Sequence, residues 1–164
     1  MGSSICCTGN QFDKKTGTMK KSVKIITGIL GVFMLVPGLA KFFEPFKTML
    51  AVQIWESELP YPTLSQIGAQ GTEIAVGLVL IFLAFYWNKL GSAISNKIFL
   101  VCHALIIATM LVALYVHFHP NVPAEVLPFE SKPPYLTSFY IILTFVNIYL
   151  SENQKKIKSE WRNR

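Results

Sequence analysis

The sequence predicts an all-α membrane protein, built as an antiparallel bundle of four transmembrane helices. Hydrophobic residues make up 52% of the chain and charged residues only 15%, whereas soluble proteins are typically about 25% charged. Four long apolar runs account for this imbalance, at residues 23–43, 64–87, 97–117 and 135–151. Each run reaches the ~17 residues that a helix needs to cross the hydrocarbon core. Residues 23–151 are therefore expected to form one transmembrane domain.

Basic residues flank the apolar runs and predict the orientation of the bundle. Lysine and arginine concentrate in the N-terminal tail (1–22), in the turn between the second and third runs (88–97) and in the C-terminal segment (152–164). Positively charged segments stay in the cytoplasm, so both termini are predicted to be cytoplasmic. Residues 1–22 are expected to be disordered and residues 152–164 to form a separate basic tail. The net charge of +6 points to an acidic lipid surface, and not to nucleic acid, as the partner of these segments.

The N-terminal tail leaves two questions open. Met19 is followed by two lysines and looks like a natural start, in which case residues 1–18 are an extension. Gly2 with Cys6 and Cys7 resembles an acylation signal, although Cys6 stands where such a signal has Ser or Thr. The three cysteines of the chain form neither a disulfide framework nor a C-x-x-C redox motif.

The first apolar run, residues 23–43, contains helix-disrupting residues near its far end. Pro37 and Gly38 are expected to kink the helix there. Gly31 lies on a small face through which another helix can approach closely. Lys41 closes the run at the depth of the membrane interface.

Residues 44–63 form a long link between the first two runs. Phe46, Leu50 and Ile54 recur every four residues after Pro45. This pattern is typical of a short helix that lies on the membrane surface. An ordinary loop is the alternative, because the apolar pattern is short.

The second run, residues 64–87, contains an acid within an apolar helix. Glu73 lies roughly ten residues into the run, about 15 Å below the outer surface at ~1.5 Å per residue. A charged group at this depth needs a partner or an aqueous cavity. Its neighbours one turn away, Ala69 and Gly77, are small. Glu73 is therefore predicted to point into the bundle, where the stem of Lys41 can reach down to pair with it.

The third and fourth runs add further polar groups. His103 lies near mid-depth in the third run, residues 97–117. The loop that follows contains several prolines and is expected to be extended. On the fourth run Tyr140, Thr144 and Asn147 share one helix face, which must contact protein or water rather than lipid.

These groups form one candidate polar site inside the bundle, comprising Lys41, Glu73, His103, Tyr140, Thr144 and Asn147. The functional interpretation is a small cavity that binds a polar head group or relays protons. The structural alternative is hydrogen bonding between helices, which is common in membrane bundles. His117 and His119 are interpreted as surface histidines, since no third ligand follows at a metal-binding spacing. No catalytic motif is present in the sequence, so neither a catalytic residue nor a metal site is predicted.

The first half of the chain resembles the DoxX family of small four-helix membrane proteins. The matching residues are Gly31, residues 37–42 (PGLAKF), Leu59 with Pro60, and residues 73–80 (EIAVGLVL). Lys41 and Glu73, which lie within these segments, are the strongest evidence for the resemblance. The resemblance is clearest over residues 25–85, and the tail before Met19 and the proline-rich loop depart from it.

The resemblance implies a four-helix bundle in the cell (inner) membrane and suggests a role beside another protein. The family takes its name from a membrane subunit associated with a thiosulfate:quinone oxidoreductase. The chain is therefore expected to be a non-catalytic or accessory subunit of a quinone-linked redox system, with quinone as the candidate cofactor. Related small bundles look like assembly or chaperone factors for client proteins, which is the alternative. A small transporter is a weaker alternative, because no inverted repeat or pair of broken helices is visible.

Overall fold

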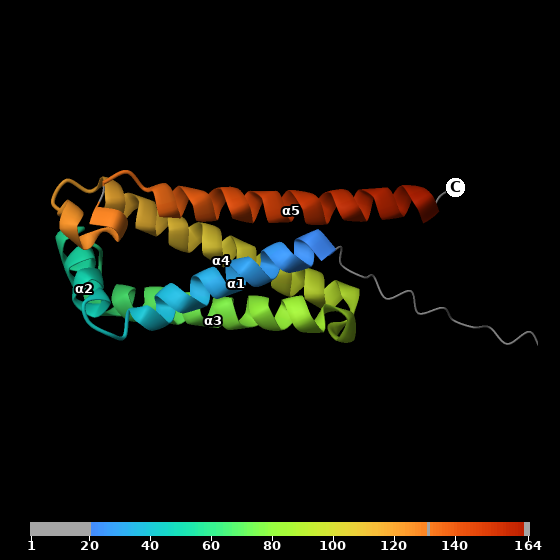
Figure 1. The fold of residues 1–164 in the computed structure, drawn as a ribbon, viewed down its shortest axis with the longest axis horizontal. Helices are drawn as coiled ribbons and strands as arrows, with labels where there is room; N and C mark the ends of the chain where they lie inside the picture. Colours follow the sequence, from blue (N-terminus) through green and yellow to red (C-terminus); the bar gives the residue numbers. More distant parts are fainter. Residues whose placement is uncertain (1–20, 131, 163–164) are drawn as a thin grey trace, which may run out of the picture.

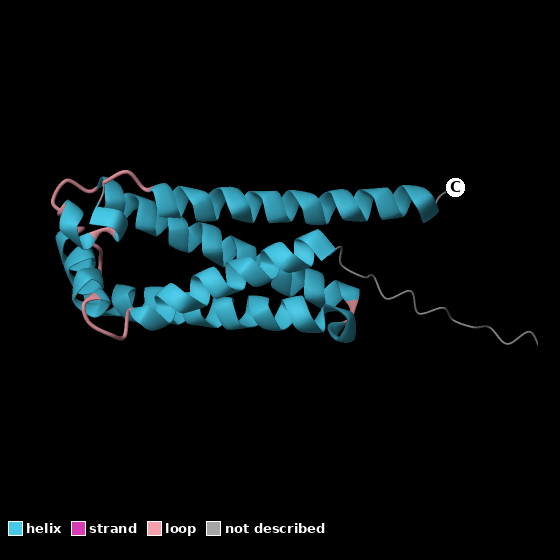
Figure 2. Ribbon diagram, viewed as in Figure 1, coloured by secondary structure: helices cyan, strands magenta, loops and turns pink. Residues whose placement is uncertain are grey.

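The computed structural model describes residues 21–130 and 132–162, which fold almost entirely into helices (Figure 1, Figure 2). Within these residues the α-helices are α1 (Lys21–Ala40), α2 (Phe46–Glu56), α3 (Pro62–Leu90), α4 (Ser92–Phe118) and α5 (Tyr135–Arg162). Two short 3₁₀ turns, η1 (Ala124–Val126) and η2 (Pro128–Glu130), lie between α4 and α5. The predicted all-α class is confirmed. Residues 1–20 of the tail that we expected to be disordered lie outside the described residues.

The four long helices form a bundle in which each packs against two others. The contacts follow the order α1, α3, α4, α5 and back to α1. Helix α2 lies across one end of the bundle beside η1 (Figure 1), and we call this the capped end. The start of α1, the turn between α3 and α4, and the end of α5 all lie at the opposite end.

Three of the described helices are long and apolar enough to cross a membrane. They are α1, α3 and the Ala93–Phe118 part of α4. Large apolar side chains on their outer surfaces are exposed, among them Ile25, Phe85 and Leu111. Helix α5 is not in this group, because polar residues are spread along its length. The three apolar helices indicate an integral, multi-pass membrane protein.

Glycines allow α1 and α3 to approach each other closely. A Cβ atom added at Gly77 would lie 2.7 Å from the backbone nitrogen of Leu35. One added at Gly31 would lie 3.0 Å from the carbonyl oxygen of Gly77, and one at Gly38 would lie 3.0 Å from the Cβ of Glu73. Backbone atoms cannot move aside as a flexible side chain can, so Gly31 and Gly77 have no room for a larger residue. The small face predicted at Gly31 is therefore part of the contact between α1 and α3.

The connection between α3 and α4 is shorter than the sequence predicts. The polar turn expected at residues 88–97 is helical except at Gly91, which alone separates the two helices. Gly91 has a φ of +79°, in the left-handed region that favours glycine. The hydroxyl of Ser95 donates a hydrogen bond of 3.2 Å to the carbonyl oxygen of Trp87 across the turn. One residue with unusual backbone freedom thus replaces a longer loop, and both helices are longer than expected.

The last helix also extends further than predicted. Residues 152–162, expected to belong to a separate tail, continue α5 as regular helix. Lys155 and Glu152 form an i,i+3 ion pair of 2.5 Å on this extension, a type of contact that supports an exposed helix. Helix α5 consequently projects past its neighbours at the end of the bundle opposite α2 (Figure 1).

The loop between α4 and α5 is folded over the capped end rather than extended. Val122 and Leu127 are buried against Val116 of α4. The burial of these apolar side chains holds the loop, with its turns η1 and η2, against the bundle. The prolines predicted an extended path because they indicate the backbone conformation that the loop prefers. They do not indicate whether the residues between them are buried.

Candidate functional site

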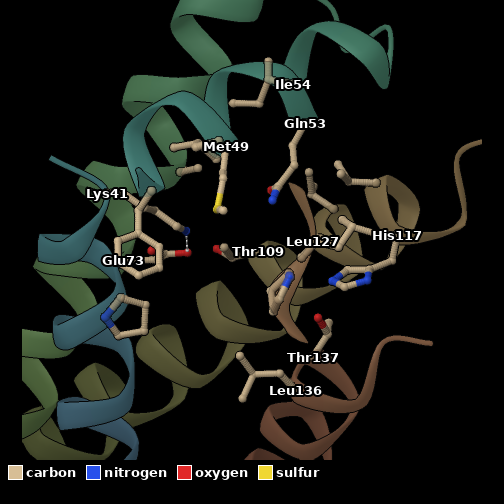
Figure 3. A pocket seen from close by; sticks show the side chains of 18 of the residues that line it. Lys41, Met49, Gln53, Ile54, Glu73, Thr109, His117, Leu127, Leu136 and Thr137 are labelled. Carbon is tan, nitrogen blue, oxygen red and sulfur yellow. Dashed lines mark hydrogen bonds and ion pairs between the residues drawn. The ribbon is translucent and has the colours of Figure 1, made fainter. Parts of the chain in front are cut away.

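A cavity of about 710 Å³ lies inside the capped end of the bundle. Its walls come from α1, α3, α4 and α5, and its roof from α2 and the segment containing η1 and η2 (Figure 3). Most of the side chains that line it are apolar, among them Met34, Leu50 and Leu136. Its size lies within the ~300–1,000 Å³ range of small-molecule sites, which usually combine apolar walls with a few polar groups.

Lys41 and Glu73 form an ion pair in the wall of this cavity (Figure 3). The Nζ atom of Lys41 lies 2.5 Å from Oε1 of Glu73, and the two side chains are 23% and 9% exposed. Lys41 follows directly after the last residue of α1. Its carbonyl oxygen accepts a hydrogen bond of 2.9 Å from Nε2 of Gln70, on the turn of α3 before Glu73. The pair and this hydrogen bond together fix the end of α1 to α3.

The second carboxylate oxygen of Glu73 has a different environment. Oε2 is buried and accepts no hydrogen bond from any described residue. A buried charged oxygen that lacks a hydrogen bond carries a large desolvation cost. Nδ1 of His117 is another buried polar atom of the cavity lining without a hydrogen-bond partner among the described residues. The ion pair of Lys41 and Glu73 therefore lines the cavity, whereas Oε2 of Glu73 and Nδ1 of His117 are buried within the surrounding side chains.

The roof of the cavity is tied to the bundle by hydrogen bonds to the backbone. The short helix predicted within residues 44–63 is present as α2, which excludes the loop alternative, and its Ile54 is buried. Nε2 of Gln53 donates to the carbonyl oxygen of Val126 in η1. The hydroxyl of Tyr115 on α4 donates over 3.3 Å to the carbonyl oxygen of Ser57, at the end of α2. These contacts hold α2 and η1 together above the cavity.

A separate polar network joins α1, α4 and α5 away from the cavity lining. Nδ2 of Asn147 donates to Oγ1 of Thr27 and to Nε2 of His103, over 3.0 Å in each case. Nδ1 of His103 lies 2.7 Å from the carbonyl oxygen of Phe99, which can only accept, so Nδ1 carries the proton. Thr27 in turn donates to the carbonyl oxygen of Val23 over 2.7 Å. The network is fully buried and connects three helices.

Tyr140 and Thr144 continue the polar face of α5 between these two regions. The hydroxyl of Tyr140 donates to the carbonyl oxygen of Phe33 on α1, and its side chain lines the cavity. Thr144 is fully buried and donates to the carbonyl oxygen of Tyr140 over 2.7 Å. Ile142 and Phe145 on the other faces of α5 are exposed. The polar stripe thus faces the interior of the bundle, as the helical spacing predicts.

The six predicted site residues do not form the single site that we expected. Lys41, Glu73 and Tyr140 line the cavity, whereas His103, Thr144 and Asn147 are not part of its lining. The predicted set lacks Thr27, which is the only hydroxyl residue in the apolar stretch 25–40 and could have been found for that reason. It also lacks Gln70, which lies one turn before Glu73. No sequence pattern indicates the contact of Gln70 with a backbone carbonyl oxygen.

The interpretation of His117 as a surface residue is wrong. Its side chain is only 5% exposed and lines the cavity, because the loop after α4 folds back over this end of the bundle. Among the described residues no group of three or more His, Cys, Asp or Glu side chains is arranged to hold a metal ion.

Comparison with known proteins gives no match: no family model, no curated protein and no solved structure matches the chain. The function is therefore inferred from the cavity, the ion pair and the membrane helices.

Proposed function

We propose that this protein is a non-catalytic, accessory membrane subunit of a quinone-linked redox system, and that it holds a quinone in the cavity at the capped end. The observation that carries the proposal is the cavity itself, with a volume of about 710 Å³ and a mostly apolar lining. Apolar walls suit the ring and the tail of a quinone. Nζ of Lys41, in the same wall, can donate a hydrogen bond to a carbonyl oxygen of the ring.

The resemblance to the DoxX family supports the proposal through the same two residues. Lys41 and Glu73 carry most of the weight of that resemblance, and they form the ion pair in the cavity wall. The family is named after a membrane subunit associated with a thiosulfate:quinone oxidoreductase. A redox enzyme is therefore the proposed partner.

We also propose that α5 crosses the membrane as a fourth span. Tyr140, Thr144 and Asn147 of α5 point into the bundle. Tyr140 and Asn147 bind partners on α1 and α4 there. The surface of α5 that faces away from the bundle carries exposed Ile142 and Phe145. Polar groups satisfied inside a bundle do not oppose insertion as lipid-exposed ones do. A fourth crossing also agrees with the position of both ends of the described chain at one end of the bundle (Figure 1).

Quinone content of the purified protein tests the proposed function. The wild-type protein, extracted from membranes in a mild detergent, is expected to yield about one quinone per chain on solvent extraction and chromatography. Ala113 of α4 lines the cavity, so Ala113→Phe fills part of it and is expected to remove most of the bound quinone. Ala108 lies on the exposed face of the same helix, and Ala108→Phe is expected to retain it. A wild-type protein without quinone, or equal quinone in both variants, would contradict the proposal.

The alternative is that the protein assists the assembly of a partner protein. It is favoured by Trp55 of α2, which is not part of the cavity lining and is 66% exposed. Such a side chain can bind an apolar segment of an incompletely folded client. A photo-crosslinking residue at position 55 would then capture one immature client in intact cells, and the purified protein would contain no quinone.

A further inference from the structure

Thr137 of α5 presents to the cavity a hydroxyl group that has no partner among the described residues. Its side chain belongs to the cavity lining, and the residue is only 5% exposed. Figure 3 shows this side chain pointing into the cavity. Its Oγ1 forms no hydrogen bond within the described part of the chain. The described atoms that are both unpartnered and sealed from solvent do not include Oγ1, so a molecule in the cavity can reach it.

The other hydroxyl and amide groups of the lining are already engaged. The following side chains donate to backbone carbonyl oxygens: Gln53, Ser65, Thr109 and Tyr140. Thr109 is the direct comparison, because its hydroxyl donates over 2.9 Å to the carbonyl oxygen of Leu105, one turn earlier on α4. Thr137 lies in the first turn of α5, where the carbonyl oxygen of Pro133 instead accepts the N–H of Tyr135 over 2.9 Å. The position of Thr137 at the start of its helix thus leaves the hydroxyl available.

Lys41 supplies a second donor from another side of the cavity. Its Nζ carries three N–H groups, and one of them is enough for the contact of 2.5 Å with Oε1 of Glu73. Lys41 and Thr137 lie on different sides of the cavity (Figure 3). A ligand that bonds to both side chains therefore needs two hydrogen-bond acceptors at separate positions of its head group.

The charge balance of the wall favours an uncharged ligand. Lys41 and Glu73 already neutralise each other, so a charged head group would add a net charge to a largely apolar cavity. Isolated charges are expensive in such surroundings. Carbonyl oxygens accept hydrogen bonds without bringing a charge. A ring with two carbonyl groups therefore suits both donors.

We propose that Thr137 determines the specificity of the cavity, by donating a hydrogen bond to the second carbonyl oxygen of an uncharged ring whose first carbonyl oxygen is bound by Lys41. The inference rests on the proposed function, because it extends the contacts of a bound quinone from one carbonyl oxygen to both. A ring with a single carbonyl group leaves one of the two donors without an acceptor. The cavity therefore distinguishes 1,4-diones from monoketones.

Two probes that differ in one carbonyl group test the inference. They are 2-decylcyclohexane-1,4-dione and 2-decylcyclohexanone, neither of which has the redox chemistry of a quinone. Binding to the full chain in lipid nanodiscs is measured from the shift in thermal unfolding, with free concentrations corrected for partition into lipid. One additional neutral hydrogen bond predicts that the wild-type protein binds the dione about three- to tenfold more tightly than the monoketone.

Thr137→Val is the decisive variant, because it replaces the hydroxyl with a methyl group of similar size. It is expected to bind the two probes equally tightly, whereas Thr137→Ser retains a hydroxyl and is expected to keep the preference for the dione. Thr109→Val is the matched control, since it removes a hydroxyl of the same cavity that is engaged with Leu105. It is expected to keep the preference. The ratio of two affinities within one variant does not depend on the stability of that variant.

The outcomes separate this inference from the proposed function. Equal binding of the two probes to the wild-type protein overturns the inference, and so does a preference that persists in Thr137→Val. Loss of the preference in Thr109→Val overturns it as well, because the effect is then not specific to the hydroxyl of Thr137. If neither probe binds, the inference fails, whereas the quinone content of the purified protein decides the proposed function independently.

Discussion

Glu73 is tolerated inside an apolar bundle because Lys41 neutralises it. A charged side chain at the centre of a transmembrane helix costs roughly 2.5–3.5 kcal/mol on insertion scales. The contact of 2.5 Å between Nζ and Oε1 replaces two isolated charges with one neutral pair. Lys41 can make this contact because its long apolar stem reaches inward from the end of α1.

Removing one member of the pair is predicted to destabilise the protein more than removing both. Glu73→Gln and Lys41→Met are each expected to lower the free energy of unfolding by about 2 kcal/mol, less than the ~3–5 kcal/mol typical of fully buried pairs, since Lys41 is partly exposed. The double variant is expected to recover much of this loss. A double-mutant cycle measured by unfolding in detergent gives the coupling energy. A coupling near zero would show that the two side chains do not stabilise each other.

Asn147 is the central residue of the buried network. Asn147→Leu removes the hydrogen bonds to Thr27 and His103, and it leaves Nε2 of His103 buried without a donor. The expected loss is about 1–3 kcal/mol, since interhelical hydrogen bonds in membrane proteins contribute about 0.6 kcal/mol on average and up to about 1.7 kcal/mol. Ile142→Leu, at an exposed position of the same helix, is the control and is expected to be neutral. Similar losses in both variants would argue against a stabilising role of the network.

At the scale of the elements, the contact between α1 and α3 depends on glycine. Gly77→Ala places a Cβ atom 2.7 Å from the backbone nitrogen of Leu35, which forces the helices apart. The expected cost is about 1–3 kcal/mol. Gly71 lies on the same helix with nothing within 4 Å of an added Cβ, so Gly71→Ala is expected to be neutral or stabilising by up to about 1 kcal/mol. Unfolding in detergent compares the two variants, and a similar effect of both would refute close packing at Gly77.

At the scale of the whole molecule, the positive charges gather at one end. Lys21 and Lys24 begin α1, Lys89 lies at the end of α3, and Lys155 belongs to the extension of α5. These segments share the end of the bundle opposite the capped end (Figure 1). The positive-inside rule therefore favours a cytoplasmic position for this end and an outer position for the cavity.

Labelling of single cysteines tests both the orientation and the fourth crossing. In a chain without its native cysteines, Glu125→Cys in the loop at the capped end is expected to react with a membrane-impermeant maleimide on intact cells. Glu152→Cys on α5 is expected to react only after the cells are opened. Both positions are exposed in the structure, so access to the reagent is decided by the membrane. Labelling of both positions on the same side would rule out a crossing by α5.

The sequence by itself determined the helical class, the helices α1, α3 and α4 as membrane-spanning candidates, and the inward face of α5. These features follow from local patterns: apolar length, the small residues around Glu73, and the spacing of Tyr140, Thr144 and Asn147. The pairing of Lys41 with Glu73 could also be predicted, because an acid within an apolar helix needs a partner and few cations are within reach.

Only the tertiary structure decided where these groups lie relative to one another. The cavity exists because α2 and the loop after α4 fold over the capped end, where Val122 and Leu127 are buried. Such burial depends on contacts between residues distant in the chain, which no local pattern reports. For the same reason the predicted polar site divides into a cavity around Glu73 and a network around Asn147. Helical spacing places a side chain on a face, but the crossing of the helices decides which side chains on those faces meet.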